Sequence, residues 1–268
     1  MMRLLAAVLF LPALAAQAQE QSADPKDAPV AVRFAEGAVH GFVVLRSESG
    51  TILAHGDLLQ TPKGGAITTE MVLRFADGSL LDETVVFTQH DVFTMLSYHL
   101  VQRGPAFDRD IDFELVGARQ AYRLITKDHE DGKEEADSGT FDLPADVYNG
   151  MVLTVLKNLS ARDSATIHMV ALTPKPRMIQ LELRATGEQK VLSGAHRETT
   201  VHWVIHPKLG ALTGFFAKLL GKTPPDNHAW IVTDDVPAFV RFEGPLYLKG
   251  PIWRIELAVP AWPGSDSK

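Results

Sequence analysis

The sequence contains no cysteine. This absence excludes disulfide bonds, and it excludes a lipid anchor on a cysteine that follows an export signal. Beyond residue 18 the chain also lacks any apolar run of 18 or more residues, so we expect no helix that spans a membrane. A folded domain must therefore be held together by its core alone, and a chain of 268 residues is long enough to bury one.

Basic residues and catalytic motifs are also scarce. The chain has 26 Lys and Arg against 33 Asp and Glu, for a net charge of −7. This balance argues against nucleic acid as a partner and gives no general attraction to anionic lipid. No glycine-rich phosphate loop and no nucleophile motif of the known hydrolases occurs. We therefore expect no nucleotide cofactor.

The histidines do not predict a metal site. His202 and His206 stand four residues apart, but they alternate with apolar residues, which is typical of a strand. Four residues of a strand span about 13 Å, whereas two ligands of one zinc lie only about 4 Å apart. We expect no metal.

The first 18 residues have the three parts of an export signal. A basic start, Met1-Met2-Arg3, precedes an uncharged run from Leu4 to Ala16, and Ala16-Gln17-Ala18 offers small residues around a larger one. The apolar run is shorter than the about 20 residues that a membrane span requires. We expect a periplasmic or secreted protein with a signal peptide at 1–18, a flexible leader at 19–29, a single β-rich domain at 30–262 and a polar tail at 263–268.

Short segments of alternating apolar and polar residues repeat every 10 residues or so, and turn signals such as Asp77-Gly78 and Asp131-Gly132 separate them. We expect strands near residues 41–46, 51–60, 71–75, 81–87, 92–101, 111–116, 121–126, 166–172, 178–185, 199–206, 229–233, 239–242 and 252–259. The pattern predicts a mainly β fold, an antiparallel curved sheet that forms a half-barrel or incomplete barrel with one or two helices.

Two segments have helical periodicity instead. Val147, Met151, Val155 and Leu159 recur every four residues and predict a helix over residues 145–159. A second helix is expected over residues 208–220, which are apolar on one face and small on the other. It fits a buried core helix or a lid over an apolar cavity, while its poor polar face argues against a membrane-surface helix.

Three functions remain open on these residues. The first is non-enzymatic binding of an apolar small molecule or lipid in the periplasm, with Leu212, Phe215, Phe216, Leu219, Trp203 and Trp230 as the candidate ligand-binding residues. The second is a structural or interaction module of the cell envelope, in which the same residues only fill a packed core. The third is a hydrolase with an unrecognised site at Asp91, Ser97 and His99. The sequence does not specify an oligomeric state or a protein partner.

Several short segments carry a family resemblance: residues 75–79 (FADGS), 102–107 (QRGPAF), 143–151 (LPADVYNGM), 156–158 (LKN), 221–226 (GKTPPD) and 242–246 (FEGPL). On these segments the chain resembles a group of uncharacterised exported bacterial proteins with a domain of unknown function. Trp230, Asp234 and Pro237 add a looser similarity in layout to periplasmic half-barrel proteins, which include lipid and lipoprotein carriers. That similarity implies a concave apolar face able to hold a lipid or acyl chain.

Overall fold

The computed structural model describes residues 29–193, 196–208, 224–233 and 236–258. The expected export signal, nearly all of the expected leader, the second helix and the polar tail lie outside these residues. The described part is mainly β, with one α-helix and one 3-10 turn. Its strands are β1 (Val39–Ser47), β2 (Ile52–Lys63), β3 (Ala66–Phe75), β4 (Leu80–Gln89), β5 (Phe93–Arg103), β6 (Arg109–Val116), β7 (Ala121–Asp128), β8 (Glu134–Thr140), β9 (Ser164–Ala171), β10 (Arg177–Ser193), β11 (His196–Lys208), β12 (Asn227–Val232), β13 (Ala238–Gly244) and β14 (Trp253–Ala258), with η2 at Gly117–Arg119 and α1 at Val152–Asn158.

All the strands belong to one antiparallel sheet of 14 strands in the order β8-β7-β6-β5-β4-β3-β2-β1-β14-β13-β12-β11-β10-β9. The chain therefore builds outward from β1 to β8, passes through α1, and returns from β9 to β14, which pairs with β1 in the middle of the sheet. The two edges, β8 and β9, are consecutive in the sequence and do not pair with each other. The predicted fold class, an open antiparallel β-sheet with a helix, is confirmed.

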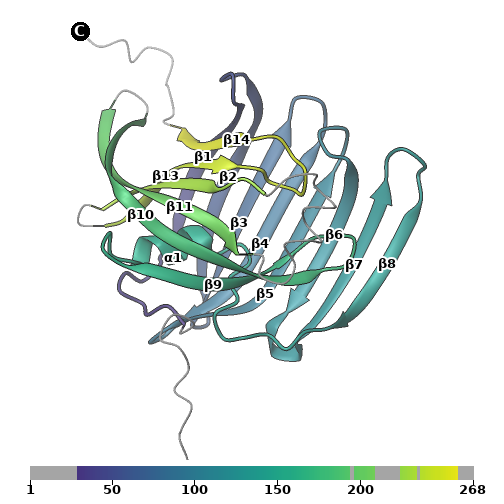
Figure 1. Ribbon diagram of the computed structural model, residues 1–268, viewed down its shortest axis with the longest axis horizontal. Helices are drawn as coiled ribbons and strands as arrows, with labels where there is room; N and C mark the ends of the chain where they lie inside the picture. The colour runs from purple at the N-terminus through teal and green to yellow at the C-terminus, as the bar shows by residue number, and fades with distance from the viewer. Residues whose placement is uncertain (1–28, 194–195, 209–223, 234–235, 259–268) are drawn as a thin grey trace, which may run out of the picture.

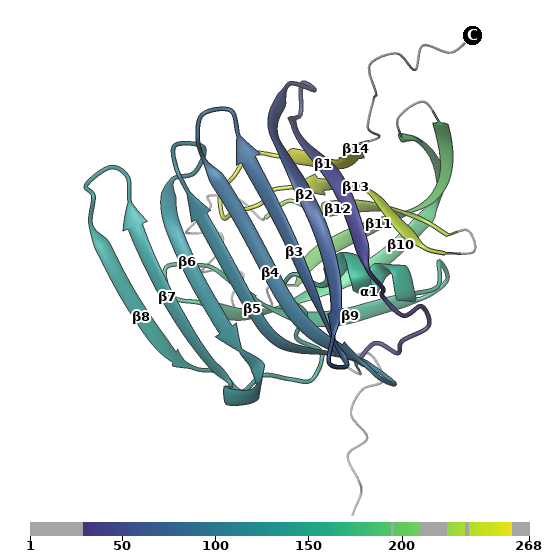
Figure 2. The ribbon, with the colours of Figure 1, turned by 180° about the vertical axis from the view of Figure 1, so that it is seen from behind.

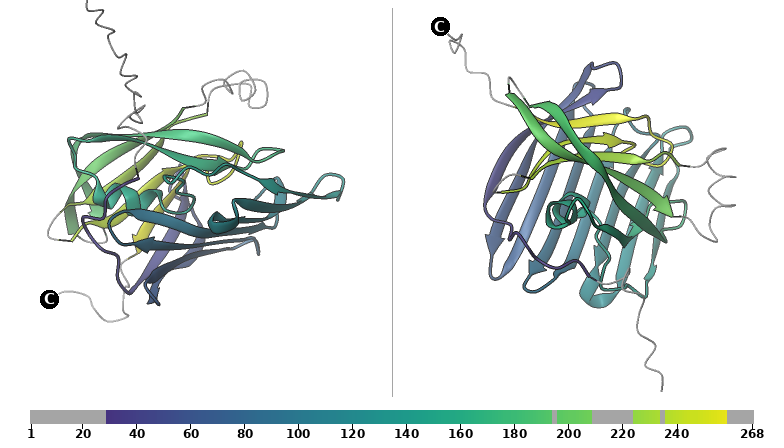
Figure 3. Two further views of the ribbon diagram at one scale, coloured as in Figure 1. Left: turned by 90° about the horizontal axis from the view of Figure 1, so that it is seen from below. Right: turned by 60° about the vertical axis from the view of Figure 1, so that its left-hand side comes forward.

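The sheet curls into two facing walls, because a strongly twisted sheet of this many strands does not stay flat. Strands β1–β8 form the first wall, which is seen from outside in Figure 2. Strands β9–β14 form the second wall and cross in front of the first in Figure 1. Helix α1 lies between the walls, as both views of Figure 3 show. Side chains of both walls and of α1 share one hydrophobic core.

The helix is shorter than the sequence predicts, because residues 146–150 are held in other contacts. The backbone of Asp146 and Tyr148 pairs with that of His168 on β9, with N···O distances of 3.0 and 2.9 Å. Gly150 has φ +69°, and a Cβ atom there would lie 3.0 Å from the Tyr98 ring, so this turn requires glycine. Only then does α1 begin. The apolar repeat runs through residues 146–150 and through α1 because both segments face the interior.

The edge strand β8 is protected by charge against pairing with another chain. Strand β8 pairs with β7 alone, and it carries the acidic residues Glu134, Glu135 and Asp137. Charge on an edge strand disfavours pairing with a second chain. The hairpin turn before it contains Gly132 with φ +69°, in agreement with the Asp131-Gly132 signal. Among the described residues, no helix has the length and apolar character needed to cross a bilayer.

Candidate functional site

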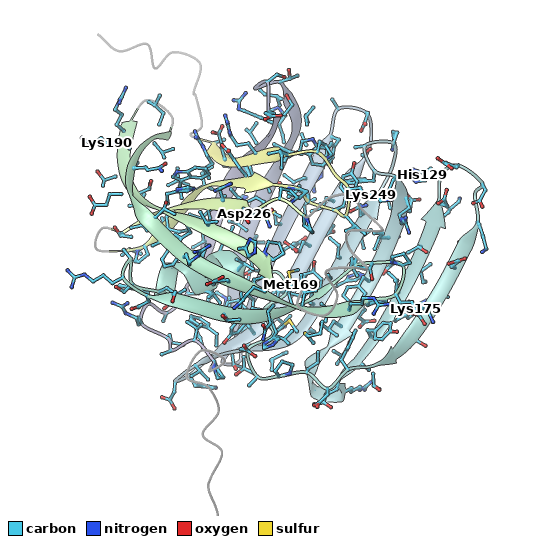
Figure 4. The ribbon with its side chains drawn as sticks, viewed as in Figure 1. His129, Met169, Lys175, Lys190, Asp226 and Lys249 are labelled. Atoms are coloured by element: carbon cyan, nitrogen blue, oxygen red, sulfur yellow. The ribbon has the colours of Figure 1, made fainter. Side chains whose placement is uncertain are left out.

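A cavity of about 760 Å³ lies between the two walls. Its lining comes from the inner faces of both walls, from α1, and from residues 34–37, which precede β1. The volume is within the range of roughly 300–1,000 Å³ that is usual for small-molecule sites. Figure 4 labels Met169 of β9, one of the lining residues. The curl of the sheet therefore leaves an internal space that the side chains of the described residues do not fill.

The second wall makes one side of the cavity apolar. Its strands contribute aliphatic and aromatic side chains: Met169, Ile179, Leu181, Ile205, Phe239, Phe242, Ile255 and Leu257. Alternation along a strand places every second residue on the inner face. In β13 the register shift between Phe239 and Arg241 resets this alternation, so Phe239 and Phe242 both line the cavity. An alkyl chain that packs against this wall would be stabilised by about 25 cal/mol for each Å² of apolar surface removed from water.

The first wall carries a polar stripe in the same cavity. It consists of Gln60, Thr69, Glu83, Tyr98 and Gln102 on the neighbouring strands β2, β3, β4 and β5, and we call these residues the inner polar stripe. Thr69 pairs with Gln60 across β2 and β3, and the Gln60 Nε2 donates a hydrogen bond of 3.1 Å to its hydroxyl. The cavity is therefore amphipathic, with one apolar and one partly polar side.

Glu83 is the central member of the stripe. The Tyr98 hydroxyl donates a hydrogen bond of 2.8 Å to the Glu83 carboxylate. Burial raises the pKa of Glu83, and the bond from Tyr98 opposes part of that rise. The pKa of Tyr98 is itself raised, first by burial and then by the neighbouring carboxylate. The pair thus places a carboxyl group with a raised pKa on the polar side of the cavity, opposite the apolar second wall.

Two amide oxygens in the cavity wall have no hydrogen-bond partner within the described part of the chain. Gln102 is 1% exposed, and its Oε1 accepts no hydrogen bond, while its Nε2 donates to the carbonyl oxygen of Arg109 at 3.3 Å. That bond fixes which end of the amide is the oxygen. Asn227, on the opposite wall, also has a buried Oδ1 without a partner. A buried acceptor left unpaired costs about 1–3 kcal/mol, so a ligand that donates to it would recover free energy.

The segment before β1 lines the cavity and is bonded to α1. The Asn158 Oδ1 accepts hydrogen bonds from the backbone N–H groups of Arg33 and Phe34, at 2.9 and 2.7 Å. The Lys157 ammonium lies 2.6 Å from a Glu36 carboxylate oxygen, and both side chains are largely buried. These contacts hold residues 33–36 against the helix, where Phe34 and Glu36 line the cavity.

Of the sequence-based ligand residues, only Trp203 and Trp230 lie in the described part of the chain, and neither lines this space. Trp203 is 1% exposed and belongs to the core, and it does not line the cavity. Trp230 lies in a small separate cluster with Val191 and Val240, and its ring stacks on His202 at 4.7 Å between centroids. Leu212, Phe215, Phe216 and Leu219 lie outside the described residues. Their assignment as ligand contacts remains a prediction.

Glu83 was not among the residues expected to bind a ligand, although the sequence carries a signal for it. It occupies the same parity as Leu81, Val85 and Phe87, so alternation alone places a carboxylate on the apolar face of its strand. A charged residue on the core-facing side of a strand is uncommon, and the structure leaves Glu83 half-buried with the Tyr98 hydroxyl as its partner.

The residues proposed for a hydrolase do not form a catalytic arrangement. His99 is exposed, and its Nε2 lies 3.0 Å from an Asp112 carboxylate oxygen. Within the described part of the chain, no hydrogen bond joins His99 to Ser97 or Asp91. In the same residues, no group of three or more His, Cys, Asp and Glu is placed to hold a metal ion. His202 and His206 lie on strand β11, as expected, and contact different partners, His228 and Asp226.

No family model and no curated protein matches the chain. Among solved structures, the chain is similar to a β-barrel-like protein of a domain of unknown function, DUF1849, from Brucella abortus. The sequences are 8% identical, the match covers 86% of this chain and 100% of the other, and the TM-score is 0.48. This likeness says nothing about function, for which the cavity is the only guide in the described residues.

Proposed function

We propose that this protein is a non-enzymatic binding protein that holds an apolar molecule, such as a lipid, in the cavity between its two walls. The observation that carries the proposal is the cavity of about 760 Å³, lined on one side by apolar side chains of the second wall. A structural module has no need of such a space, because an unfilled apolar cavity costs stability. A ligand that fills it removes that cost.

Tail length gives the first test. Straight-chain alcohols of increasing length, from octanol to tetradecanol, would be titrated into the chain that lacks residues 1–18 and followed by calorimetry. Each added CH₂ group that enters the cavity should strengthen binding by about 0.8 kcal/mol. The gain should stop when the chain outgrows the cavity. No binding at any length would overturn the proposal and favour the structural module.

Two neighbouring leucines of β2 provide a matched pair of variants. Leu58 lines the cavity, whereas Leu59 is 39% exposed on the outer face. Leu58→Trp fills part of the space and should weaken dodecanol binding about tenfold or more, because the bulk displaces several CH₂ groups. Leu59→Trp adds the same bulk outside and should leave binding unchanged. Equal effects of the two variants would argue against the cavity as the site.

We further propose that the protein acts outside the cytoplasm, which the pattern of residues 1–18 supports. Cell fractionation followed by N-terminal sequencing tests this directly. The expected product begins at Gln19. Lipid extraction and native mass spectrometry of the same fraction should reveal a bound apolar species. An intact Met1 in the cytoplasmic fraction would overturn the proposed location without touching the binding proposal.

A further inference from the structure

Among the described residues, one acidic side chain of the cavity has no basic partner. Its charged lining residues are Glu36, His40, Glu83, Asp108, Arg109, Lys157 and Lys249. Glu36 pairs with Lys157, Asp108 with Arg109 and His40 with Asp57. Lys249 is exposed to solvent. Among the described residues this leaves Glu83, whose partner is the neutral Tyr98 hydroxyl, as the interior acid without a basic partner.

A second acceptor lies beside this carboxyl. Glu83 is directly opposite Leu100 in the pairing of β4 with β5, so Tyr98 and Gln102 are its two diagonal neighbours. Diagonal neighbours on one face of a sheet are about 7–8 Å apart. The unpartnered Oε1 of Gln102 and the Glu83 carboxylate can therefore both reach a small group placed between them, since a nitrogen lies about 2.9 Å from each oxygen it binds. These two side chains therefore offer two oxygen acceptors to the head group of a ligand.

We propose that the ligand is a single-chain aliphatic amine, whose ammonium group is held between Glu83 and Gln102 while its tail lies along the apolar second wall. An ammonium donates three hydrogen bonds and accepts none, which complements a carboxylate and an amide oxygen. A carboxylate head would instead meet the negative charge of Glu83 and the lone pairs of Gln102. A hydroxyl head donates a single bond and is the intermediate case.

Part of the desolvation penalty for an ion pair between Glu83 and an ammonium group arises when the protein folds, before the ligand binds. Removing two opposite charges from water often costs as much as their attraction returns. Here Glu83 is already partly desolvated in the ligand-free protein, so the incoming ammonium bears most of the remaining loss of water. The expected preference for an amine over its neutral analogue is about tenfold or more, the factor that a hydrogen bond to a charged group contributes.

The experiment compares three heads on one tail, and it rests on the proposed function. Dodecylamine, dodecanol and dodecanoic acid would be titrated at pH 7, below their micelle concentrations, into the chain without residues 1–18. The expected order of affinity is amine, then alcohol, then acid. If none of the three binds, the proposed function fails as well. If the alcohol binds and the amine is no tighter, or if the acid binds most tightly, only the inference about the head group is overturned.

Variants separate the carboxyl from the general negative charge of the protein. Glu83→Gln should remove the preference for the amine and leave dodecanol binding within about twofold, since the tail contacts are unchanged. Glu114→Gln, an exposed acid on β6, is the matched control and should change nothing. Glu83→Asp keeps the charge and should retain the order of affinities, which guards against a Glu83→Gln protein that fails to fold. An amine preference that survives in folded Glu83→Gln would contradict the proposal.

Discussion

The side chain of Asn149 makes both main-chain hydrogen bonds of Val170. Its Nδ2 donates to the Val170 carbonyl oxygen at 2.9 Å, and its Oδ1 accepts from the Val170 N–H at 2.8 Å. Val170 lies on β9, at an edge of the sheet. One amide side chain thus takes the place of a neighbouring strand and satisfies an edge that faces the protein interior.

Asn149→Ala should therefore lower the free energy of unfolding by about 2–4 kcal/mol, because it leaves a buried donor and a buried acceptor unpaired. Urea denaturation measures the change. Hydrogen exchange gives an internal control: the Val170 amide should lose protection, while the Ile167 amide, which pairs with β10, should keep it. Equal protection at Val170 in both proteins would contradict this role for Asn149.

Alanine substitutions at Gly150 and Gly132 separate the cost of close packing from the cost of backbone strain. Gly150→Ala has to adopt a φ of +69° and also places a Cβ atom 3.0 Å from the Tyr98 ring. Gly132 has the same φ of +69°, but nothing lies within 4 Å of its position. Gly132→Ala should cost about 1 kcal/mol from strain alone. Gly150→Ala should cost at least 1 kcal/mol more, since overpacking adds about 1–3 kcal/mol. Thermal unfolding of both variants would show whether the turn before α1 depends on contact with Tyr98.

Glu83 should give the protein a distinctive pH dependence. Its pKa is raised in the folded state, so between the unfolded and the folded pKa the native protein binds more protons than the unfolded chain. Stability contributed by this group is therefore lost as the pH rises through that interval. Relative to the wild type, Glu83→Gln should become more stable as the pH is raised from 4 to 7.

Urea titrations of both proteins at several pH values provide the measurement, since the other titrating groups cancel in the difference. Glu114→Gln serves again as the exposed control and should show a difference that does not vary with pH. A constant difference for Glu83→Gln as well would mean that the pKa of Glu83 is not raised.

The segment before β1 should detach from the helix when its anchor is removed. Asn158→Ala removes the acceptor for the N–H groups of Arg33 and Phe34 and leaves the ion pair of Glu36 with Lys157 in place. Hydrogen exchange of residues 30–36 should become faster, while the central strands stay protected. Lys157→Met is the complementary variant, which removes the ion pair and keeps the hydrogen bonds. Unchanged exchange in both would show that other contacts hold the segment.

The local features of the fold were predictable because they are local in origin. The alternation in Leu81, Glu83 and Val85 predicts a strand, and Asp77-Gly78 predicts its turn, which the φ of +87° at Gly78 confirms. The pairing of β1 with β14 was not predictable, because alternation specifies a face and not a neighbour. The helix boundary was wrong for a similar reason: what shortens the helix is contact between residues 146–149 and β9, some 20 residues away.

The candidate site was predictable only in its general character. The apolar second helix and the similarity in layout to half-barrel carriers predict an apolar cavity, and the structure has a cavity between the walls. Which aromatic side chains line it depends on strand register, and Trp230 illustrates the limit, since it packs with Val191 and Val240 instead. The inner polar stripe joins residues of four strands, and no single segment of sequence displays it.

The strand order also determines when the molecule can be completed. Strand β1 is the first to be synthesised and β14 the last, yet they are hydrogen-bonded neighbours, with Val43 opposite Leu257. During synthesis one edge of β1 stays unpaired until β14 has emerged, after all the other strands. Contacts between residues so distant in the chain slow folding, and an unpaired strand edge makes the incomplete chain prone to aggregation. The central seam of the sheet is thus the last part that a growing chain can form.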